Sequence, residues 1–495
     1  MTSRKQPALS RRVFLAGMAA LAAASRTVGQ SVAAIVPNLN QILGRPGRDS
    51  LTISVISPIA GQIAVDYGYT KTKYASTSAT TAVRANVPTV LTLQKLKPNS
   101  SVYYRIKHRP TPGSAWTPGT QNVARTQRAA GSTFSFTVQG DTHPERAGKM
   151  FNAELYTVTM ANIAAQKPDF HILLGDDFSI DPLIGKGQAN ATNVDKIYAT
   201  HRSWLSLSTV PIFLVNGNHE QAAAYLLDGT TTNPAVLAGR ARTTYFPLPT
   251  NDGIYSVDPT QVDGVGELRD YYAWTWGDAL FVTLDPYWHS KYAVDNVAGV
   301  SNDQAATAKK SGGAGAKVSD LWQVGIGDEQ YQWFKHLLET STAKYKFVFA
   351  HHVMGTGRGA IEVSTDYEWG GRDPKGQTTF AEQRPTWELP IHDLMVKHGV
   401  SVFFQGHDHI FVQQERDGLI YQSMPNPADD TFSMFNDTAY KSGVKAPNSG
   451  HLRVTVGPSN ARVEYFLAAR AKDTAGGRKN LQVAHSYTVQ PWTRA

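Results

Sequence analysis

Short apolar segments with alternating polar positions fill the chain from Leu51 to about residue 130. Four of them, LTISVIS, QIAVDYG, TVLTLQKL and SVYYRIKH, carry β-branched or aromatic residues at every second position and are separated by Gly, Pro, Asn or Ser. Alternation at period two is typical of half-buried strands, and the segments contain no helical periodicity. We therefore predict an all-β sandwich over residues 34–130.

The pattern changes after the small polar linker AAGS at residues 129–132. STFSFTVQG is an apolar strand pattern, the next segment places Phe151, Leu155 and Val158 on one helical face, and DFHILLGD is a second strand pattern. Alternation of strand, helix and strand predicts an α/β layered domain over residues 131–495. Two polar stretches, residues 296–319 and 355–384, interrupt it, and loops of such length are typical of functional lids or of disorder.

Polar clusters follow five of the apolar strands. FSFTVQ is followed by GDTH, FHILL by GDD, PIFLVN by GNHE, YKFVFA by HH, and VSVFFQ by GHDH. Ligands in α/β proteins bind beyond the carboxyl ends of the strands, so we expect the five clusters to form one shared site. A glycine opens most of the clusters and lets the backbone turn sharply and approach closely.

The chemistry of these clusters indicates metal ions. The chain of 495 residues contains no cysteine, which excludes disulfides, zinc ribbons, iron–sulfur clusters and cysteine nucleophiles. Asp, His and Asn without sulfur suit Fe, Mn, Zn or Co. The candidate ligands are too many for one ion that keeps an open position, so we predict two divalent or trivalent ions that share a bridge. His171, in the middle of a strand, is expected to be a core histidine.

The five motifs together resemble the signature of the calcineurin-like metallophosphoesterase superfamily, over about residues 132–426. The resemblance implies an α/β/β/α four-layer sandwich. In the upstream region, LKPNSSVYYRI resembles part of a fibronectin type III domain, and the pair of domains resembles the purple acid phosphatase arrangement. Ser179 stands where those enzymes carry a tyrosine ligand, and they usually lack the histidine found here as His143. The expected site is therefore closer to the bacterial phosphodiesterase and phosphatase branches.

The resemblance also implies which residues hold the ions. Seven side chains would do so, three on the first ion, three on the second and one between them: Asp141, His143 and His409; Asn218, His351 and His407; and Asp176. The register leaves either His351 or His352 as the ligand. We choose His351 because it directly follows the strand, and we expect its neighbour to face the substrate.

A phosphate ester is the substrate that the resemblance implies, hydrolysed by in-line attack of a hydroxide between the ions. Two metal ions bring more positive charge than the two ligand carboxylates compensate, which favours an anionic substrate and transition state. His219 is the candidate to protonate the leaving group, with Glu220 orienting it. Asn218 and His352 are further candidates to contact the substrate, and Asp408 is expected to be structural.

The charge of the chain adds little evidence for a polyanionic partner. The net charge is +8, but five basic residues and no acidic ones lie in the first 33 residues, and no basic block follows. We therefore expect no nucleic-acid partner.

The N-terminal segment LSRRVFLAGMAALAAAS resembles a twin-arginine export signal. The apolar run from Val13 to Ala24 is too short to span a bilayer comfortably. We predict a signal peptide over residues 1–33, cleaved after Ala24 or nearer Ala33, rather than an N-terminal amphipathic helix. The resemblance implies export by the twin-arginine machinery and a periplasmic or secreted protein with no transmembrane segment in the mature chain.

Three functions compete. The first is an exported dinuclear-metal phosphoesterase, a phosphatase or phosphodiesterase that scavenges phosphate. The second is a cell-surface binding protein with a vestigial metal site, which the retention of all seven ligands disfavours. The third is a metal-dependent hydrolase of other esters. Selectivity is expected in the long loops, with His289, Arg358, Trp369 and Arg372 as possible rim residues.

Overall fold

The fold is that of a computed structural model, which describes residues 38–221, 227–290, 321–353, 357–373 and 375–493. The predicted signal peptide and the stretch at residues 296–319 lie outside these ranges. No helix in the described part of the chain is long and apolar enough to cross a bilayer.

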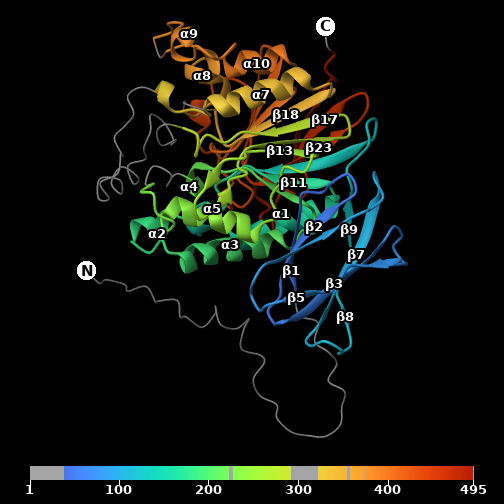
Figure 1. Cartoon of the computed structure of the whole chain (residues 1–495). Helices are drawn as coiled ribbons and strands as arrows, with labels where there is room; N and C mark the ends of the chain where they lie inside the picture. Colours follow the sequence, from blue (N-terminus) through green and yellow to red (C-terminus); the bar gives the residue numbers. More distant parts are fainter. Residues whose placement is uncertain (1–37, 222–226, 291–320, 354–356, 374, 494–495) are drawn as a thin grey trace, which may run out of the picture. The chain divides into compact units, whose positions relative to one another are not determined.

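Two antiparallel sheets form the N-terminal region (Figure 1). The first sheet has the order β1-β2-β6, and in the second β3 and β7 pair with four short strands. Their bounds are β1 (Asn40–Gly44), β2 (Leu51–Ile56), β3 (Gly61–Gly68), β4 (Ser76–Thr77), β5 (Thr81–Val83), β6 (Thr89–Leu93), β7 (Ser101–Arg109), β8 (Thr117–Pro118) and β9 (Asn122–Arg125). Ile53, Val65 and Val102 belong to one core between the sheets. The four strands predicted here are confirmed, and the likeness to a fibronectin type III domain stays a prediction.

Two larger sheets form the rest of the protein. One has the order β12-β11-β10-β23-β24-β25 and the other the order β13-β16-β17-β18-β19-β21-β20-β22. The bounds of the first are β10 (Phe134–Gln139), β11 (Phe170–Leu173), β12 (Ile212–Leu214), β23 (Gly450–Val456), β24 (Ala461–Leu467) and β25 (Val483–Val489). Those of the second are β13 (Tyr255–Val257), β16 (Tyr272–Trp276), β17 (Ala279–Thr283), β18 (Tyr345–Ala350), β19 (Val402–Gln405), β20 (Phe411–Arg416), β21 (Leu419–Ser423) and β22 (Val444–Ala446). A separate hairpin pairs β14 (Gln261–Val262) with β15 (Gly266–Glu267).

The two sheets pack face to face through aromatic side chains. Phe136 lies 5.0 Å from Phe281 and 5.3 Å from Phe347, measured between ring centroids, and all three are fully buried. Side chains alternate along a strand, so Phe347 and Phe349 of β18 enter the core between the sheets while Val348 enters the core on the other face. Burial on both faces explains why the parallel strands are continuous apolar runs.

Helices cover the outer face of each sheet (Figure 1). The first sheet packs on α1 (Ala153–Gln166), α3 (Ala191–Leu205) and α5 (Pro234–Tyr245), and the second on α7 (Asp328–Thr340) and α10 (Ile391–Lys397). The short helices near the loops are α2 (Asp181–Gly185), α4 (Asn218–Gln221), α8 (Tyr367–Gly370) and α9 (Phe380–Gln383). The layers are therefore helix, sheet, sheet and helix, the order that the family resemblance implied.

Helix α1 differs from its predicted face. Leu155 is buried as expected, but Phe151 precedes the helix and Val158 is only half-buried. The buried side is shifted by about one residue and includes Tyr156 and Ile163. Tyr156 is apolar enough to enter the core while its hydroxyl accepts a hydrogen bond from Gln139 Nε2 at 3.1 Å.

The second long stretch, residues 355–384, is packed against the protein in its described part. Trp369 of α8 is fully buried and donates a hydrogen bond of 2.8 Å to Tyr421 Oη. It is therefore a core residue, and the prediction that it lies at a rim is wrong. The indole is amphipathic, and from sequence its burial could not be separated from a place at the surface.

Arg202 of α3 joins the N-terminal sandwich to the α/β region. Its buried guanidinium donates to Asn40 Oδ1 at 2.8 Å, to Ser54 Oγ at 2.9 Å and to the Ser54 carbonyl at 2.6 Å. It also donates to the carbonyl of Tyr245. Burial lowers the pKa of Arg202 to about 9. Ile42 of β1 shares a core cluster with α3, so the two regions are joined by apolar as well as polar contacts.

Replacing Arg202 by Ala is expected to destabilise the protein by about 3 kcal/mol, because buried acceptors in β2 and α5 lose their donor and a cavity forms. The measurement is the midpoint of urea unfolding. Arg240→Ala is the matched control, since its pair with Asp195 is about one-third exposed and should contribute less than about 1 kcal/mol. Equal midpoints for the two variants would contradict the joining role of Arg202.

Candidate metal centre

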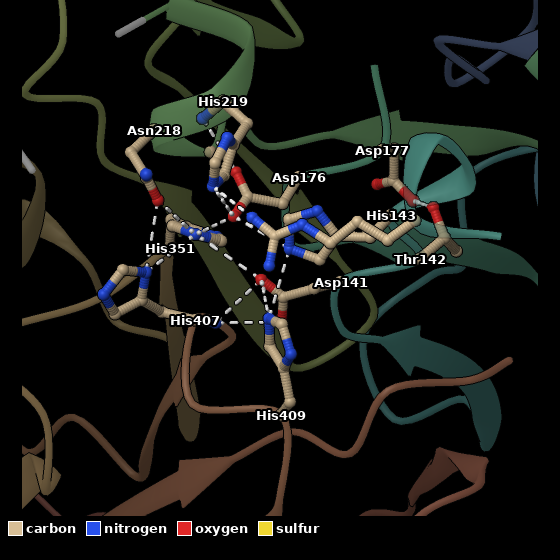
Figure 2. Close-up of polar contacts among 12 residues, drawn as sticks. Asp141, Thr142, His143, Asp176, Asp177, Asn218, His219, His351, His407 and His409 are labelled. Atoms are coloured by element: carbon tan, nitrogen blue, oxygen red, sulfur yellow. Dashed lines mark hydrogen bonds and ion pairs between the residues drawn. The ribbon is translucent and has the colours of Figure 1, made fainter. Parts of the chain in front are cut away.

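The loops after five strands bring the predicted residues to one small site (Figure 2). The loops after β10, β11 and β12 come from one sheet, and those after β18 and β19 from the other. Asp141 and His351 are fully buried, and the side chains of Asp176, Asn218 and His407 are nearly so. The expectation that five clusters share one site is confirmed by this geometry.

Asp141, His143 and His409 form the first group. One ligand atom from each lies within 4.8 Å of those of the others. The Nε2 atoms of the two imidazoles face each other at 3.2 Å, and His409 Nε2 lies 3.8 Å from Asp141 Oδ1. Burial, with the neighbouring His143, holds the pKa of His409 well below its ordinary value. A neutral ring nitrogen beside a carboxylate is a good metal ligand.

Asp176, His351 and His407 form the second group. Asn218 belongs with them, since its Oδ1 lies 3.1 Å from His351 Nε2 and 3.2 Å from His407 Nδ1. The carbonyl of Leu174 lies 2.6 Å from His351 Nδ1 and leaves Nε2 directed at the group. A backbone acceptor of this kind fixes the ring orientation of metal-ligating histidines.

His352 points elsewhere. Its Nδ1 lies 3.2 Å from Tyr287 Oη, and its ring lies 4.8 Å from that of His407, with 27° between the ring planes. Its Nε2 has no hydrogen-bond partner among the described residues. The geometry therefore favours His351 over His352 as the ligand and leaves His352 beside the group.

The carboxylate of Asp176 lies between the two groups. Its Oδ2 is 3.4 Å from His143 Nε2 and 3.1 Å from His351 Nε2, while its Oδ1 accepts the backbone N–H of His219 at 2.9 Å. Burial would raise the pKa of Asp176, but His351 and His219 outweigh burial and hold it well below its ordinary value. Burial raises the pKa of Asp141 to about 6. Asp176 is thus the carboxylate best placed to serve two ions.

The backbone at the site is strained. His143, Asp176, His407 and His409 have φ values of 48°, 58°, 67° and 53°, in the left-handed region that costs a non-glycine residue about 1–3 kcal/mol. Gly217 permits a close approach, because a Cβ there would lie 2.1 Å from Asp176 Oδ1. The close approach predicted from the glycines is therefore present at this position.

His219 lies at the edge of the first group, on α4. Its Nδ1 is 2.6 Å from Asp181 Oδ2, and its Nε2 is 3.9 Å from Asp176 Oδ2. Burial alone would lower the pKa of His219, but the two carboxylates raise it to about 9. The Nη2 atom of Arg146 lies 3.1 Å from His219 Nε2. The imidazole is thus oriented by Asp181 and directed toward the cluster.

Glu220 does not orient His219, so this part of the sequence prediction is wrong. Its buried carboxylate accepts four backbone N–H groups at 2.5–2.9 Å, those of Asp176, Asp177, Phe178 and Gly217. Glu220 therefore joins the loop after β11 to the loop after β12. Neighbouring residues on a helix point in different directions, which is why adjacency to His219 was misleading.

Asp181 and Glu145 are the residues that sequence reasoning missed. Glu145 Oε1 lies 2.8 Å from His143 Nδ1, and Asp181 Oδ2 lies 2.6 Å from His219 Nδ1. Imidazoles at metal sites usually have a carboxylate or carbonyl partner on the second nitrogen. Glu145, two residues after His143, could have been found by that rule. Asp181 is distant from His219 in sequence and could not.

Asp408 has the structural role predicted for it. Its carboxylate accepts from Arg358 Nη1 at 2.9 Å, Gly359 N at 3.1 Å and Tyr440 Oη at 2.5 Å. Arg358 also donates to the carbonyl of His407, so the network fixes the loop that carries two candidate ligands. His289 is likewise engaged, with Nε2 3.0 Å from Asp258 Oδ2. His171 is a core histidine as predicted, since Thr137 and Gln139 contact its two nitrogens.

The ligand atoms of this centre are arranged in a way that suits metal ions. Imidazole nitrogens that face each other at 3.2–3.3 Å have lone pairs directed at common points, which an ion would satisfy. The side-chain Nδ2 of Asn218 and Nε2 of His407 have no partner among the described residues, so the opposite atoms, Oδ1 and Nδ1, are the ones directed inward. Carboxylate, imidazole and amide oxygen donors suit hard or borderline metals.

Comparisons with known proteins identify a family and a similar fold. The family model described as Calcineurin-like phosphoesterase matches residues 134–411. The fold is similar to the solved structure of PhoD, with a TM-score of 0.59 and 16% identity over 91% of this chain and 90% of that chain. A weaker likeness links it to GAP50, the anchor in the inner membrane complex of Plasmodium, with a TM-score of 0.34 and 11% identity over 73% and 90% of the two chains. A search of curated proteins found no match.

Replacing Glu220 by Ala is expected to speed amide hydrogen exchange at residues 176–178 by more than about tenfold, since hydrogen bonds to a charged group contribute about 1.5–3 kcal/mol each. The measurement is exchange followed by mass spectrometry of peptides that cover this loop. His219→Ala, at the neighbouring position, is the control and should leave exchange at these amides nearly unchanged. Equal exchange in Glu220→Ala and the unmodified protein would contradict the role assigned to this carboxylate.

Proposed function

Because the chain belongs to the calcineurin-like phosphoesterase family, we propose that it hydrolyses phosphate esters with two metal ions held around Asp176. One observation carries the proposal. Two His/Asp groups, each compact enough for an ion, meet at one carboxylate whose Oδ2 lies within 3.4 Å of an imidazole nitrogen of each group. A single ion would not use both groups.

The proposed ligands follow the two groups. Three side chains hold the first ion, three hold the second and one serves both: Asp141, His143 and His409; Asn218, His351 and His407; and Asp176. Fe, Mn, Zn and Co all suit these donors. When bound, the ions supply Lewis acidity toward a phosphate oxygen and lower the pKa of water.

The side chains around the ligands have separate tasks. Only Asp141 and Asp176 contribute carboxylates to the two groups, so the occupied site keeps positive charge for an anionic ester. His219 donates a proton to the leaving oxygen, because Asp181 holds its Nδ1 and its Nε2 faces the cluster. Asn218 contacts the substrate beside the second ion. His352, whose Nε2 has no hydrogen-bond partner in the described part of the chain, lies next to His407 and contacts the substrate there.

The biological setting proposed is phosphate scavenging outside the cytoplasm. The support is the twin-arginine-like segment SRRVFL, followed by a short apolar run and small residues. A cell-surface binding protein with a vestigial site is the alternative. A decayed site would be expected to lose ligands, whereas all seven proposed ligand residues are present and lie close together.

Hydrolysis of 4-nitrophenyl phosphate and of bis(4-nitrophenyl) phosphate tests the function and separates monoesterase from diesterase activity. We expect turnover that a chelator abolishes and that Mn²⁺, Zn²⁺ or Fe restores, because the proposed reaction depends on the metal ions as Lewis acids. Metal content per chain is measured on the same sample. A protein that binds two ions and hydrolyses neither ester would favour the binding-protein alternative.

Asp176→Ala and His219→Ala are expected to separate metal binding from proton transfer. His219→Ala should lower kcat by about 10²–10⁴-fold with metal content unchanged, since it removes a proton donor at the edge of the site. Asp176→Ala should lower both activity and metal content, because both groups lose a shared carboxylate. The measurements are kcat and metal per chain. Full metal retention in Asp176→Ala would remove Asp176 from the bridging position.

A further inference from the structure

A pocket of about 390 Å³ lies beside the candidate metal centre, between α3 and the segments that follow two of the ligands. Glu145 lines it and holds His143 Nδ1. Pro182 lines it and follows Asp181, the partner of His219. The residues that line this side of the pocket are therefore close in sequence to residues of the metal centre.

The walls of the pocket are mostly apolar. Pro144, Leu183, Ile197 and Trp204 line it together with Pro182. Its volume is in the range of small-molecule sites, which combine apolar walls with a few polar groups. Two acidic residues, Glu145 and Asp177, and one basic residue, Lys196, also line the pocket, so neither sign of charge dominates and the apolar walls favour an uncharged group. Proline rings and an indole present flat faces that suit a ring.

Two buried polar side chains of the pocket lack partners in the described structure. His201 is 1% exposed and Ser179 is 3% exposed, and neither ring nitrogen of His201 nor the hydroxyl of Ser179 makes a hydrogen bond. The nearest carboxylate oxygen to His201 Nε2 is Asp177 Oδ1, at 3.5 Å. Burial lowers the pKa of His201 to about 3, so the ring is neutral. Buried groups of this kind are costly unless a ligand or water satisfies them.

We propose that this pocket binds the organic part of the phosphate ester, an uncharged ring with at least one hydrogen-bonding group that His201 and Ser179 meet. The inference rests on the proposed function, which places the phosphate at the metal centre. The protein would then select esters by their alcohol, through α3 and α2 rather than through the metal ligands. Ser179, which the sequence comparison marked as a departure from the tyrosine of purple acid phosphatases, has its place in this pocket.

The test is the affinity of the metal-loaded protein for benzylphosphonate and methylphosphonate, measured by titration calorimetry, since phosphonates are not hydrolysed. We expect benzylphosphonate to bind at least tenfold more tightly. Thr200 is an exposed α3 residue that lines the pocket, and Thr200→Trp fills it from the surface. This variant should bring the ratio of the two affinities close to one. The control is Ser203→Trp, an exposed position of the same helix outside the pocket, which should leave the ratio within twofold.

A second variant tests the hydrogen-bonding part. We expect 4-hydroxybenzylphosphonate to bind several-fold more tightly than benzylphosphonate. We expect His201→Phe to remove that advantage without lowering the melting temperature, because the imidazole has no hydrogen bond to lose among the described residues. Equal binding of the two aromatic phosphonates by the unmodified protein would overturn the role of His201 and Ser179.

The outcomes separate this inference from the proposed function. A protein that hydrolyses nitrophenyl esters but shows no preference for benzylphosphonate, or keeps its preference in Thr200→Trp, overturns the pocket. A protein that hydrolyses no ester but shows the preference and loses it in Thr200→Trp supports the pocket and overturns the hydrolytic function.

Discussion

The structure depends on the burial of two carboxylates within a few ångströms of five imidazoles. Asp141 and Asp176 lie in a space from which water is largely excluded, and burial opposes their ionisation. The imidazoles differ in how far they oppose this effect of burial. His351 and His219 keep the pKa of Asp176 low, whereas the rings of His407 and His409 stay neutral. A polar cluster of this density is costly in a protein interior unless its members are paired. Cations would supply the missing pairing.

The two-sheet scaffold makes this concentration possible. Strands of both sheets end at the same place, so ligands far apart in sequence meet without long side chains. Rigid packing of Phe136, Phe281 and Phe347 between the sheets holds the strand ends while four site residues keep left-handed backbone angles. Glu220 and Asp408 then fix the connecting loops through backbone hydrogen bonds. Strain at the site is therefore opposed by a core that cannot relax easily.

The sequence predicted those parts of the protein that depend on local patterns. Apolar runs and the polar residues at their ends identified the strands and the place of the candidate ligands, because period and adjacency are written in the chain. The partner of a side chain that contacts residues distant in sequence could not be predicted from such local patterns. Glu220 was assigned to its neighbour His219 but caps a loop, and Trp369 was placed at a rim but lies in the core. The partner of His219 proved to be Asp181, which begins a different helix, α2. The metal assignments and the export signal stay predictions.

Helix α3 connects the N-terminal sandwich to the candidate site. His201 lines the pocket beside the metal centre, and the next residue, Arg202, donates to Asn40 and Ser54 of the sandwich. Consecutive residues on a helix point about 100° apart, so one turn of α3 can face the pocket and the sandwich at once. The sandwich contributes no candidate ligand, yet it restrains the helix that forms the pocket wall. The sandwich therefore contacts the helix of the pocket wall directly, whereas the two central sheets hold the metal ligands in place.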